Sequence, residues 1–116
     1  MDLGNLPVID WEQGIRLAGN KRDLAEEMLA LLMKGLPQDI TAINNAFHAQ
    51  NYSELLRLVH KLHGALCYCG LPRLKTIAGC LETQLKNNIM DSLPSLIKQL
   101  DSEVALLLGR NSLPKT

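Results

Sequence analysis

Apolar residues recur along most of the chain at intervals of three or four, which is the spacing of one face of an α-helix. Four long segments show this pattern, and glycine, proline or asparagine residues separate them. Their stripes are Leu24, Met28, Leu31, Leu32, Ile40, Ile43 and Phe47; Leu55, Val59, Leu62 and Leu66; Leu74, Ile77, Ala78, Leu81 and Leu85; and Leu93, Ile97, Leu100, Val104 and Leu107. One stripe per segment predicts helices that share a single core.

The N-terminal third predicts a short helix followed by a long helical segment. Asp10 can cap a helix starting at the next residue, and Gly19 with Asn20 can end it and cap the following one. Pro37 lies inside the long segment, where it removes a backbone donor. Residues 20–49 therefore form either one kinked helix or two short ones.

The remaining boundaries follow from caps and helix breakers. They are Asn51 or Ser53 to Gly70, Leu71-Pro72 to Asn87-Asn88, and Asp91 or Ser92 to Gly109, with Pro94 in the last helix's first turn. Short connections favour antiparallel neighbours. We expect an all-α protein, an antiparallel up-down four-helix bundle with a short additional N-terminal helix. Residues 1–116 would form one domain, with a structured core at about 8–109 and a tail at 111–116.

Composition agrees with a helical protein and narrows the possible partners. Of the 116 residues, 47% are hydrophobic and 3% aromatic, and leucine outnumbers the β-branched residues that favour strands. The 12 Lys and Arg balance the 12 Asp and Glu, so the chain lacks the net charge that drives non-specific binding to nucleic acid or acidic membranes. We therefore expect neither partner, and any charged docking surface would be local.

The cysteines and the hydropathy favour a cytoplasmic domain. Cys67, Cys69 and Cys80 are an odd set with close spacing, which is atypical of disulfide-stapled secreted domains. No apolar run reaches the roughly 20 residues of a membrane-spanning helix. The N-terminus also lacks the pattern of a signal peptide.

His60 is the leading candidate for chemistry. At about 100° per residue it lies a third of a turn from the core direction of its helix, at the edge of the bundle. Arg57, Lys61 and Gly64 are its neighbours on that side. A nucleophilic nitrogen, positive charge and open space are what transfer of a phosphoryl group requires.

Glu82 is expected to lie beside this histidine. Leu71 lies eleven residues from both His60 and Glu82, so an antiparallel hairpin turning there brings the two to the same height. A carboxylate in that position can accept the proton of one ring nitrogen and leave the other free to attack. Gly79, three residues earlier, leaves the same side of its helix without a projecting side chain.

At these positions the chain resembles the histidine-containing phosphotransfer (HPt) domains of multistep two-component signalling. Their active helix reads roughly A-H-x-L-K-G, followed by G-x-x-x-L and L-E; here residues 59–64 read VHKLHG, residues 70–74 read GLPRL, and Leu81-Glu82 follow. The resemblance covers nearly the whole chain. The sequence is also similar to the C-terminal domain of BarA-type hybrid sensor kinases. Val59 replaces the usual alanine and His63 the usual lysine, and an imidazole with a pKa near 6.5 carries less charge than lysine.

The resemblance implies that His60 accepts a phosphoryl group from a receiver-domain aspartyl phosphate and passes it to the receiver of a response regulator. Mg²⁺ would come with the receiver, and no kinase activity is implied. Such a domain would be a monomer in isolation and could belong to the cytoplasmic part of a membrane-bound sensor kinase. The expected roles are phosphoacceptor for His60, ring orientation for Glu82, phosphoryl environment for Lys61, Arg57 and His63, and receiver docking for Gly64, Gly79 and Lys75. His63 lies nearer the core stripe than His60, so a structural role is the alternative for it.

Two other interpretations compete with phosphotransfer. His60, His63 and Cys67 lie on one helix at offsets that could place nitrogen and sulfur ligands around zinc. The chain could also be a passive helical interaction module. Arg57, Lys61, Lys75 and Lys86 could instead be an ordinary solvated face, and we expect Lys75 and Lys86 to be partly that. His48 is expected to be a surface residue.

Overall fold

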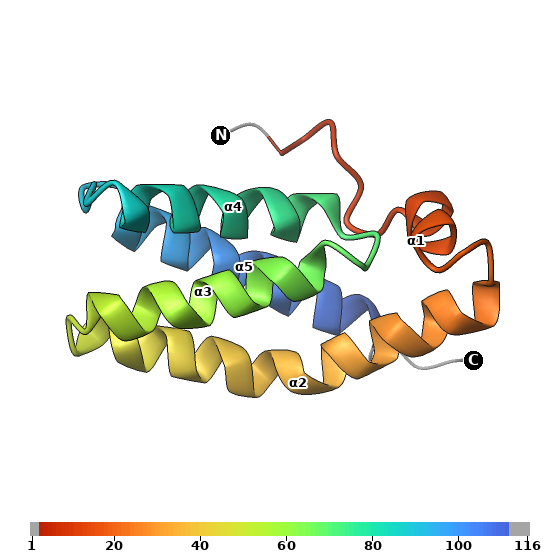
Figure 1. Cartoon of the computed structure of the whole chain (residues 1–116), viewed down its shortest axis with the longest axis horizontal. Helices are drawn as coiled ribbons and strands as arrows, with labels where there is room; N and C mark the ends of the chain where they lie inside the picture. The colour runs from red at the N-terminus through yellow and green to blue at the C-terminus, as the bar shows by residue number, and fades with distance from the viewer. Residues whose placement is uncertain (1–2, 112–116) are drawn as a thin grey trace.

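The computed structural model describes residues 3–111, with side chains up to residue 109, and within that range it contains five helices and no strand. They are α1 (Trp11–Leu17), α2 (Arg22–His48), α3 (Tyr52–Leu66), α4 (Pro72–Lys86) and α5 (Leu93–Asn111). Consecutive long helices run antiparallel, and α2 also contacts α5, which closes the bundle (Figure 1). The predicted all-α bundle with a short N-terminal helix is confirmed.

The core is aliphatic, as the composition indicated. All the stripe residues predicted for α3, α4 and α5 are buried, among them Leu55, Leu81 and Leu100 with no exposed surface. Full burial of one such side chain stabilises the fold by roughly 1.5–3 kcal/mol. The aligned stripes therefore fix which side of each helix faces inward, and they leave the flanking positions at the bundle edge.

The long helix α2 is continuous through Pro37 and bends near its middle in Figure 1. This settles the alternative of one helix or two in favour of one. The stripe predicted for its first half was wrong: Leu31 is 65% exposed, and Leu24 is exposed as well. The buried residues there are Ala25, Leu29, Met33 and Leu36. That series has the same helical spacing in another phase, so packing against the other helices decided which of two apolar series faces the core.

Two of the predicted caps are present. The Asp10 carboxylate accepts the Gln13 backbone N–H at 3.0 Å, and the Asn51 side chain accepts that of Glu54 at 3.3 Å. The sequence predicted that Asn20 caps α2, but it does not. Its φ is +66°, so it belongs with Gly19 (φ +69°) to the left-handed turn after α1, and the cap residue of α2 is the one that follows.

Two predicted helix ends were displaced. Helix α3 ends at Leu66 rather than Gly70, because residues 67–70 form the turn into α4, and α5 continues past Gly109 to Asn111. The Asp10 N–H donates to the Gly70 carbonyl at 2.7 Å, and a Cβ at Gly70 would overlap the Asp10 carbonyl oxygen. Glycine is required there because the start of α1 lies directly against the α3–α4 turn.

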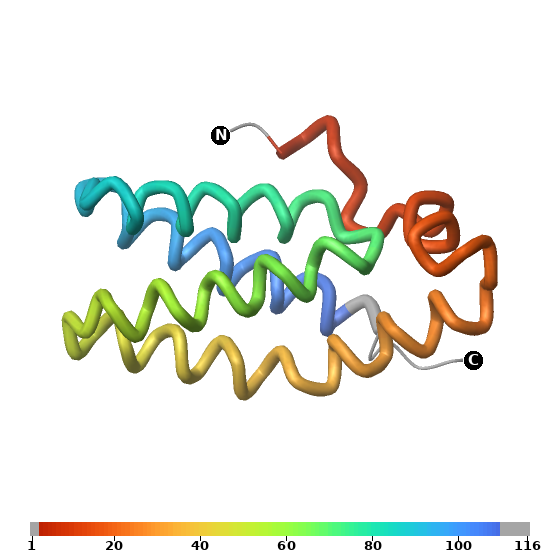
Figure 2. Tube along the Cα trace, viewed as in Figure 1, coloured from red at the N-terminus to blue at the C-terminus, as the bar shows by residue number. Residues whose placement is uncertain are grey.

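The trace in Figure 2 shows α3 and α4 as a long hairpin leading out of that turn. Within residues 3–111, no helix is both long and apolar enough to cross a membrane. Leu3 is buried against the core, so packing begins ahead of the predicted boundary near residue 8. The predicted tail, 111–116, falls almost entirely outside the described residues.

Candidate functional site

Helix α3 places His60 on the surface of the bundle. The preceding residue, Val59, is fully buried, so the next position along the helix lies at the edge, and the His60 side chain is 71% exposed. One turn further on, a Cβ at Gly64 would have no other atom within 4 Å. The ring therefore lies beside open space on the side towards the end of the helix.

Glu82 reaches the ring from α4. Its side chain is 8% exposed, and its Oε2 is hydrogen-bonded to Nδ1 of His60. Its Oε1 lies 2.7 Å from Nδ1 of His63, and Nζ of Lys86 lies 3.1 Å from Oε2. A single buried carboxylate thus joins two histidines of α3 to a lysine of its own helix.

These partners keep the carboxylate ionised. The hydrogen bond from His60 is the largest influence, and with Lys86 and His63 it lowers the pKa of Glu82 to about 2, although burial acts to raise it. An ionised carboxylate can only accept hydrogen bonds, so Nδ1 must carry a proton on both His60 and His63. Nε2 of His60 has no hydrogen-bond partner among the described residues, and in the neutral ring it carries the lone pair.

The predicted cations lie near His60 but are not bonded to it. The Arg57 guanidinium binds the Glu54 carboxylate through two hydrogen bonds, of 2.6 and 2.9 Å. Lys61 is exposed and borders a small hollow between α2 and α3 beside Asp39. Both contribute positive charge at a distance, whereas the cation in contact with the carboxylate is Lys86.

Lys86 is the residue that the sequence reasoning underrated. It was predicted to lie partly on a solvated face, and its side chain is 58% exposed, but its ammonium group also contacts Glu82 within the site. The spacing of four residues between Glu82 and Lys86 is the signal that could have revealed it, because such pairs share one face of a helix.

Gly79 and Lys75 lie on the side of the His63 ring that faces away from Glu82. A Cβ at Gly79 would come within 3.3 Å of Nε2 of His63, so this glycine makes room for the ring. Lys75 and Thr76 line a hollow of about 400 Å³ together with His63 and Gly79. Two of the three positions predicted for docking, Gly79 and Lys75, therefore adjoin His63, whereas Gly64 lies beside open space.

The zinc interpretation finds no support in the arrangement of the side chains. Among the described residues, no three His, Cys, Asp or Glu side chains are placed to hold a metal ion. Cys67, Cys69 and Cys80 are free thiols. Cys69 is buried, and burial raises its pKa, so it behaves as a small core residue.

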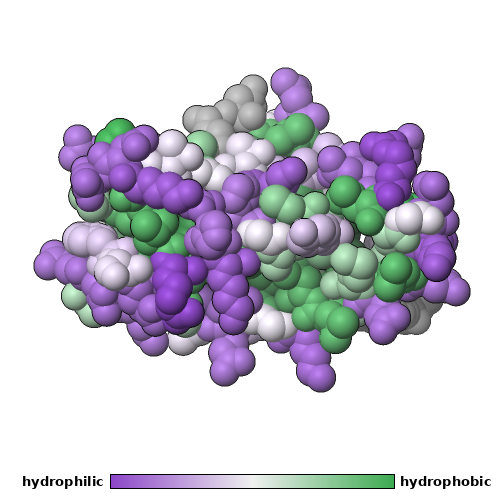
Figure 3. Space-filling model, in the orientation of Figure 1, coloured by the Kyte–Doolittle hydropathy of each residue, from purple (hydrophilic) through white to green (hydrophobic). Residues whose placement is uncertain are grey.

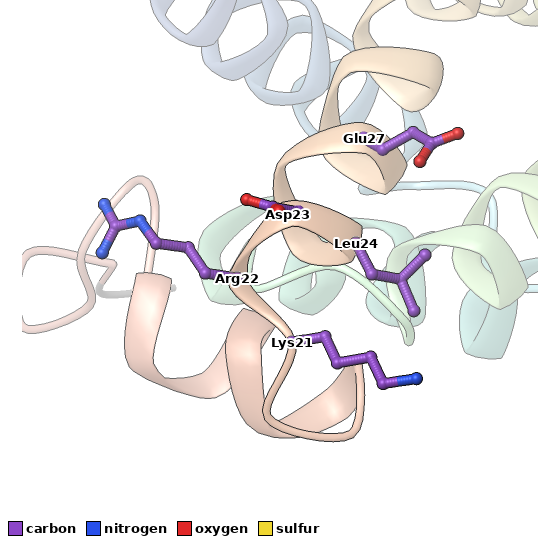
Figure 4. A pocket seen from close by; sticks show the side chains of 5 residues that line it. All are labelled: Lys21, Arg22, Asp23, Leu24 and Glu27. Atoms are coloured by element: carbon purple, nitrogen blue, oxygen red, sulfur yellow. The ribbon is translucent and has the colours of Figure 1, made fainter.

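Among the other hollows, two border α2 away from His60. One, of about 570 Å³, is at the start of α2, where the Lys21, Arg22 and Glu27 side chains diverge and their charges are mixed (Figure 4). The other is an apolar groove between α2 and α3, visible as green side chains in Figure 3 and bordered by Leu31 and Tyr68. Neither brings convergent reactive groups together.

Comparisons with known proteins agree on one family. Residues 27–109 match the Hpt domain family. The chain is 39% identical over 106 residues to the sensor protein GacS of Pseudomonas syringae pv. syringae, covering 86% of this chain and 12% of that protein. It is 36% identical over 95 residues to the signal transduction histidine-protein kinase BarA of Escherichia coli (strain K12), covering 80% and 10% respectively. The crystal structure of an HPT domain from a Shewanella hybrid histidine kinase superposes with a TM-score of 0.76 at 29% identity, covering 94% of this chain and 97% of that one.

Proposed function

This chain belongs to the Hpt domain family, and we propose that His60 is its phosphoacceptor in a multistep phosphorelay. His60 takes the phosphoryl group from the aspartyl phosphate of one receiver domain and delivers it to the aspartate of a response-regulator receiver. One observation carries the proposal. The exposed ring is held at Nδ1 by a buried, ionised carboxylate, which leaves Nε2 as the nucleophile.

The transfer step follows from that geometry. The Nε2 lone pair attacks phosphorus, an N–P bond forms, the acyl O–P bond breaks, and the receiver aspartate leaves as a carboxylate. The Nδ1 proton stays in its hydrogen bond to Glu82, whose negative charge stabilises the cationic phosphorylated ring. Transfer to the second receiver is the reverse reaction.

Other side chains support the incoming group without contacting the ring. Lys61, Arg57 and Lys86 supply positive charge around the site for the phosphoryl oxygens. Gly64 leaves clear ground beside His60, and Gly79 and Lys75 extend the surface on which a receiver docks. We assign Mg²⁺ to the receiver.

The setting of the domain is also part of the proposal. The chain spans about a tenth of the length of the curated relatives it matches, and those relatives are sensor kinases. We assign it the role of an Hpt domain within a cytoplasmic relay, with receiver domains as partners and no kinase activity of its own. Neither nucleic acid nor direct membrane contact is required, and the isolated domain is expected to be monomeric.

The test compares phosphoryl acceptance by the wild type and His60→Gln. Two donors are used: a receiver domain charged with acetyl phosphate in Mg²⁺, and phosphoramidate, a small donor that needs no docking. His60→Gln should accept no phosphoryl group from either, and it should still fold, because His63 and Lys86 continue to hold the Glu82 carboxylate. His48→Gln is the matched control and should react normally. Acid-labile label on His60→Gln, or label mapped to His48 or His63, contradicts the proposal.

Glu82→Gln tests the orienting role in the same assay. The two imidazoles donate to different oxygens of Glu82, and glutamine offers one oxygen and one NH2 group in their place, so one ring loses its acceptor and the rate should fall by about 10- to 100-fold without reaching zero. Glu26→Gln is the control. It breaks the exposed ion pair between Arg22 and Glu26 on α2 and should not change the rate. A wild-type rate for Glu82→Gln returns this residue to a purely structural role.

A further inference from the structure

The Glu82 carboxylate is bound at both of its oxygens by histidines of α3. Oε2 meets Nδ1 of His60, and Oε1 lies 2.7 Å from Nδ1 of His63. From this shared contact we infer that His63 is a positioning residue for phosphotransfer, which acts on His60 by fixing the orientation of Glu82. The inference rests on the proposed function and assigns His63 a role different from direct contact with the phosphoryl group.

Glu82 needs such a restraint because its own side chain does not supply one. The last torsion of a glutamate is broad, so its carboxylate turns easily unless both oxygens are held. Lys86 binds the same oxygen as His60, at 3.1 Å, so without His63 both donors would hold Oε2 and neither would hold Oε1. With Oε1 fixed by His63, the carboxylate keeps Oε2 directed at the phosphoacceptor ring.

The surroundings of His63 fix its ring in turn. Its side chain is 29% exposed, less than half the exposure of the His60 side chain. Nδ1 faces Glu82, and the opposite edge of the ring lies against Gly79, where a Cβ would come within 3.3 Å of Nε2. Lys75 is the other charged group bordering the same hollow.

Gly79 gains a reason from this arrangement. Glycine inside a helix destabilises it by roughly 0.5–1 kcal/mol relative to alanine. Here any side chain would press on the His63 ring and displace the donor that holds Glu82. Neither ring nitrogen of His63 is directed at Nε2 of His60, so the influence of His63 passes through the carboxylate.

The experiment measures labelling by phosphoramidate, which removes receiver docking from the comparison. His63→Leu loses the donor and should slow labelling on the order of tenfold. His63→Asn places an amide nitrogen where Nδ1 stood and should keep most of the wild-type rate. The ¹⁵N resonances of His60 give a second readout, because the share of the ring protonated at Nδ1 should fall in His63→Leu and not in His63→Asn.

A double-mutant cycle with Gly79→Ala makes the test specific. Gly79→Ala should slow labelling of the wild type, and it should have no effect in the His63→Asn background, where the outer ring atoms are gone. Gly35→Ala is the control and should not change the labelling rate, because a Cβ at this glycine of α2 would make only an ordinary contact, 3.8 Å from Asp39. An equal slowing in both backgrounds would overturn the link between Gly79 and His63.

The outcomes separate this inference from the proposed function. A wild type that takes no label at His60 defeats the proposed function itself. A wild type that is labelled at His60, together with His63→Leu that reacts at the same rate and leaves the His60 resonances unchanged, overturns only the positioning role.

Discussion

Helix α4 contributes to two ion pairs that each contain one buried carboxylate, one pair on each side of the helix. The two pairs differ in what surrounds them. Towards α3, its own Glu82 meets His60, His63 and Lys86. Towards α5, its Arg73 meets Glu103. The two carboxylate side chains are almost equally buried, at 8% and 9% exposed. Burial of a carboxylate therefore does not by itself distinguish a reactive site from a structural pair.

The partners distinguish them. Arg73 is 24% exposed, and its Nε and the second oxygen of Glu103 are buried without a hydrogen-bond partner among the described atoms. That pair is enclosed between two helices and fixes how they align. Both oxygens of Glu82 are satisfied, and two of its donors, His60 and Lys86, extend into solvent. The enclosed pair joins two helices, and the open one leaves an imidazole nitrogen accessible, as the proposed phosphoacceptor requires.

The largest effect is expected from breaking the enclosed pair. Arg73→Met should lower the free energy of unfolding by about 3–5 kcal/mol, because it leaves Glu103 buried and unpaired. Urea denaturation measures the loss, and phosphoramidate labelling of the folded protein should not change. Adding Glu103→Leu should restore most of the stability. A loss below about 1 kcal/mol would show that water solvates Glu103 and that the pair is not enclosed.

A smaller effect is expected when acid titrates the open pair. The pKa of Glu82 is lowered from 4.5 to about 2, so its contribution to stability is complete above pH 4.5 and is lost as the pH falls towards 2. Urea denaturation at steps from about pH 6 to about pH 3 should show a steeper loss in the wild type than in Glu82→Gln. Glu26→Gln should follow the wild type. Parallel curves for all three proteins would mean that the open pair adds nothing to stability.

The smallest effect on stability tests the open ground beside His60. Gly64→Ala should raise the free energy of unfolding by roughly 0.5–1 kcal/mol, since a Cβ there meets no other atom, and Gly64→Leu should melt no lower than wild type. Transfer from a phosphorylated receiver should slow as the side chain grows, while phosphoramidate labelling changes much less. Normal receiver transfer by Gly64→Leu would contradict the clearance argument.

The sequence predicted the region around His60 better than the first half of α2. In α3 and α4 the stripes are strong leucine series, so the helical phase and the shared height of His60 and Glu82 could be derived from the hairpin. The first half of α2 has two apolar series at helical spacing, one containing Leu24 and the other containing Ala25. Contacts with the other helices bury the series containing Ala25. The contact between Arg73 and Glu103 joins residues thirty positions apart on different helices, and no local spacing reveals it.

The exposure of His60 on one face of a single helix has a kinetic consequence. With Nδ1 bound to Glu82, Nε2 is the one ring nitrogen that the donor receiver and the acceptor receiver must both approach if His60 is the phosphoacceptor. The two receivers therefore exclude each other, and relay through this domain follows a ping-pong order with a free phosphorylated form between the two encounters. An excess of unphosphorylated acceptor should then inhibit phosphorylation of His60 by the donor. Each receiver must dissociate before the other can bind and exchange the phosphoryl group.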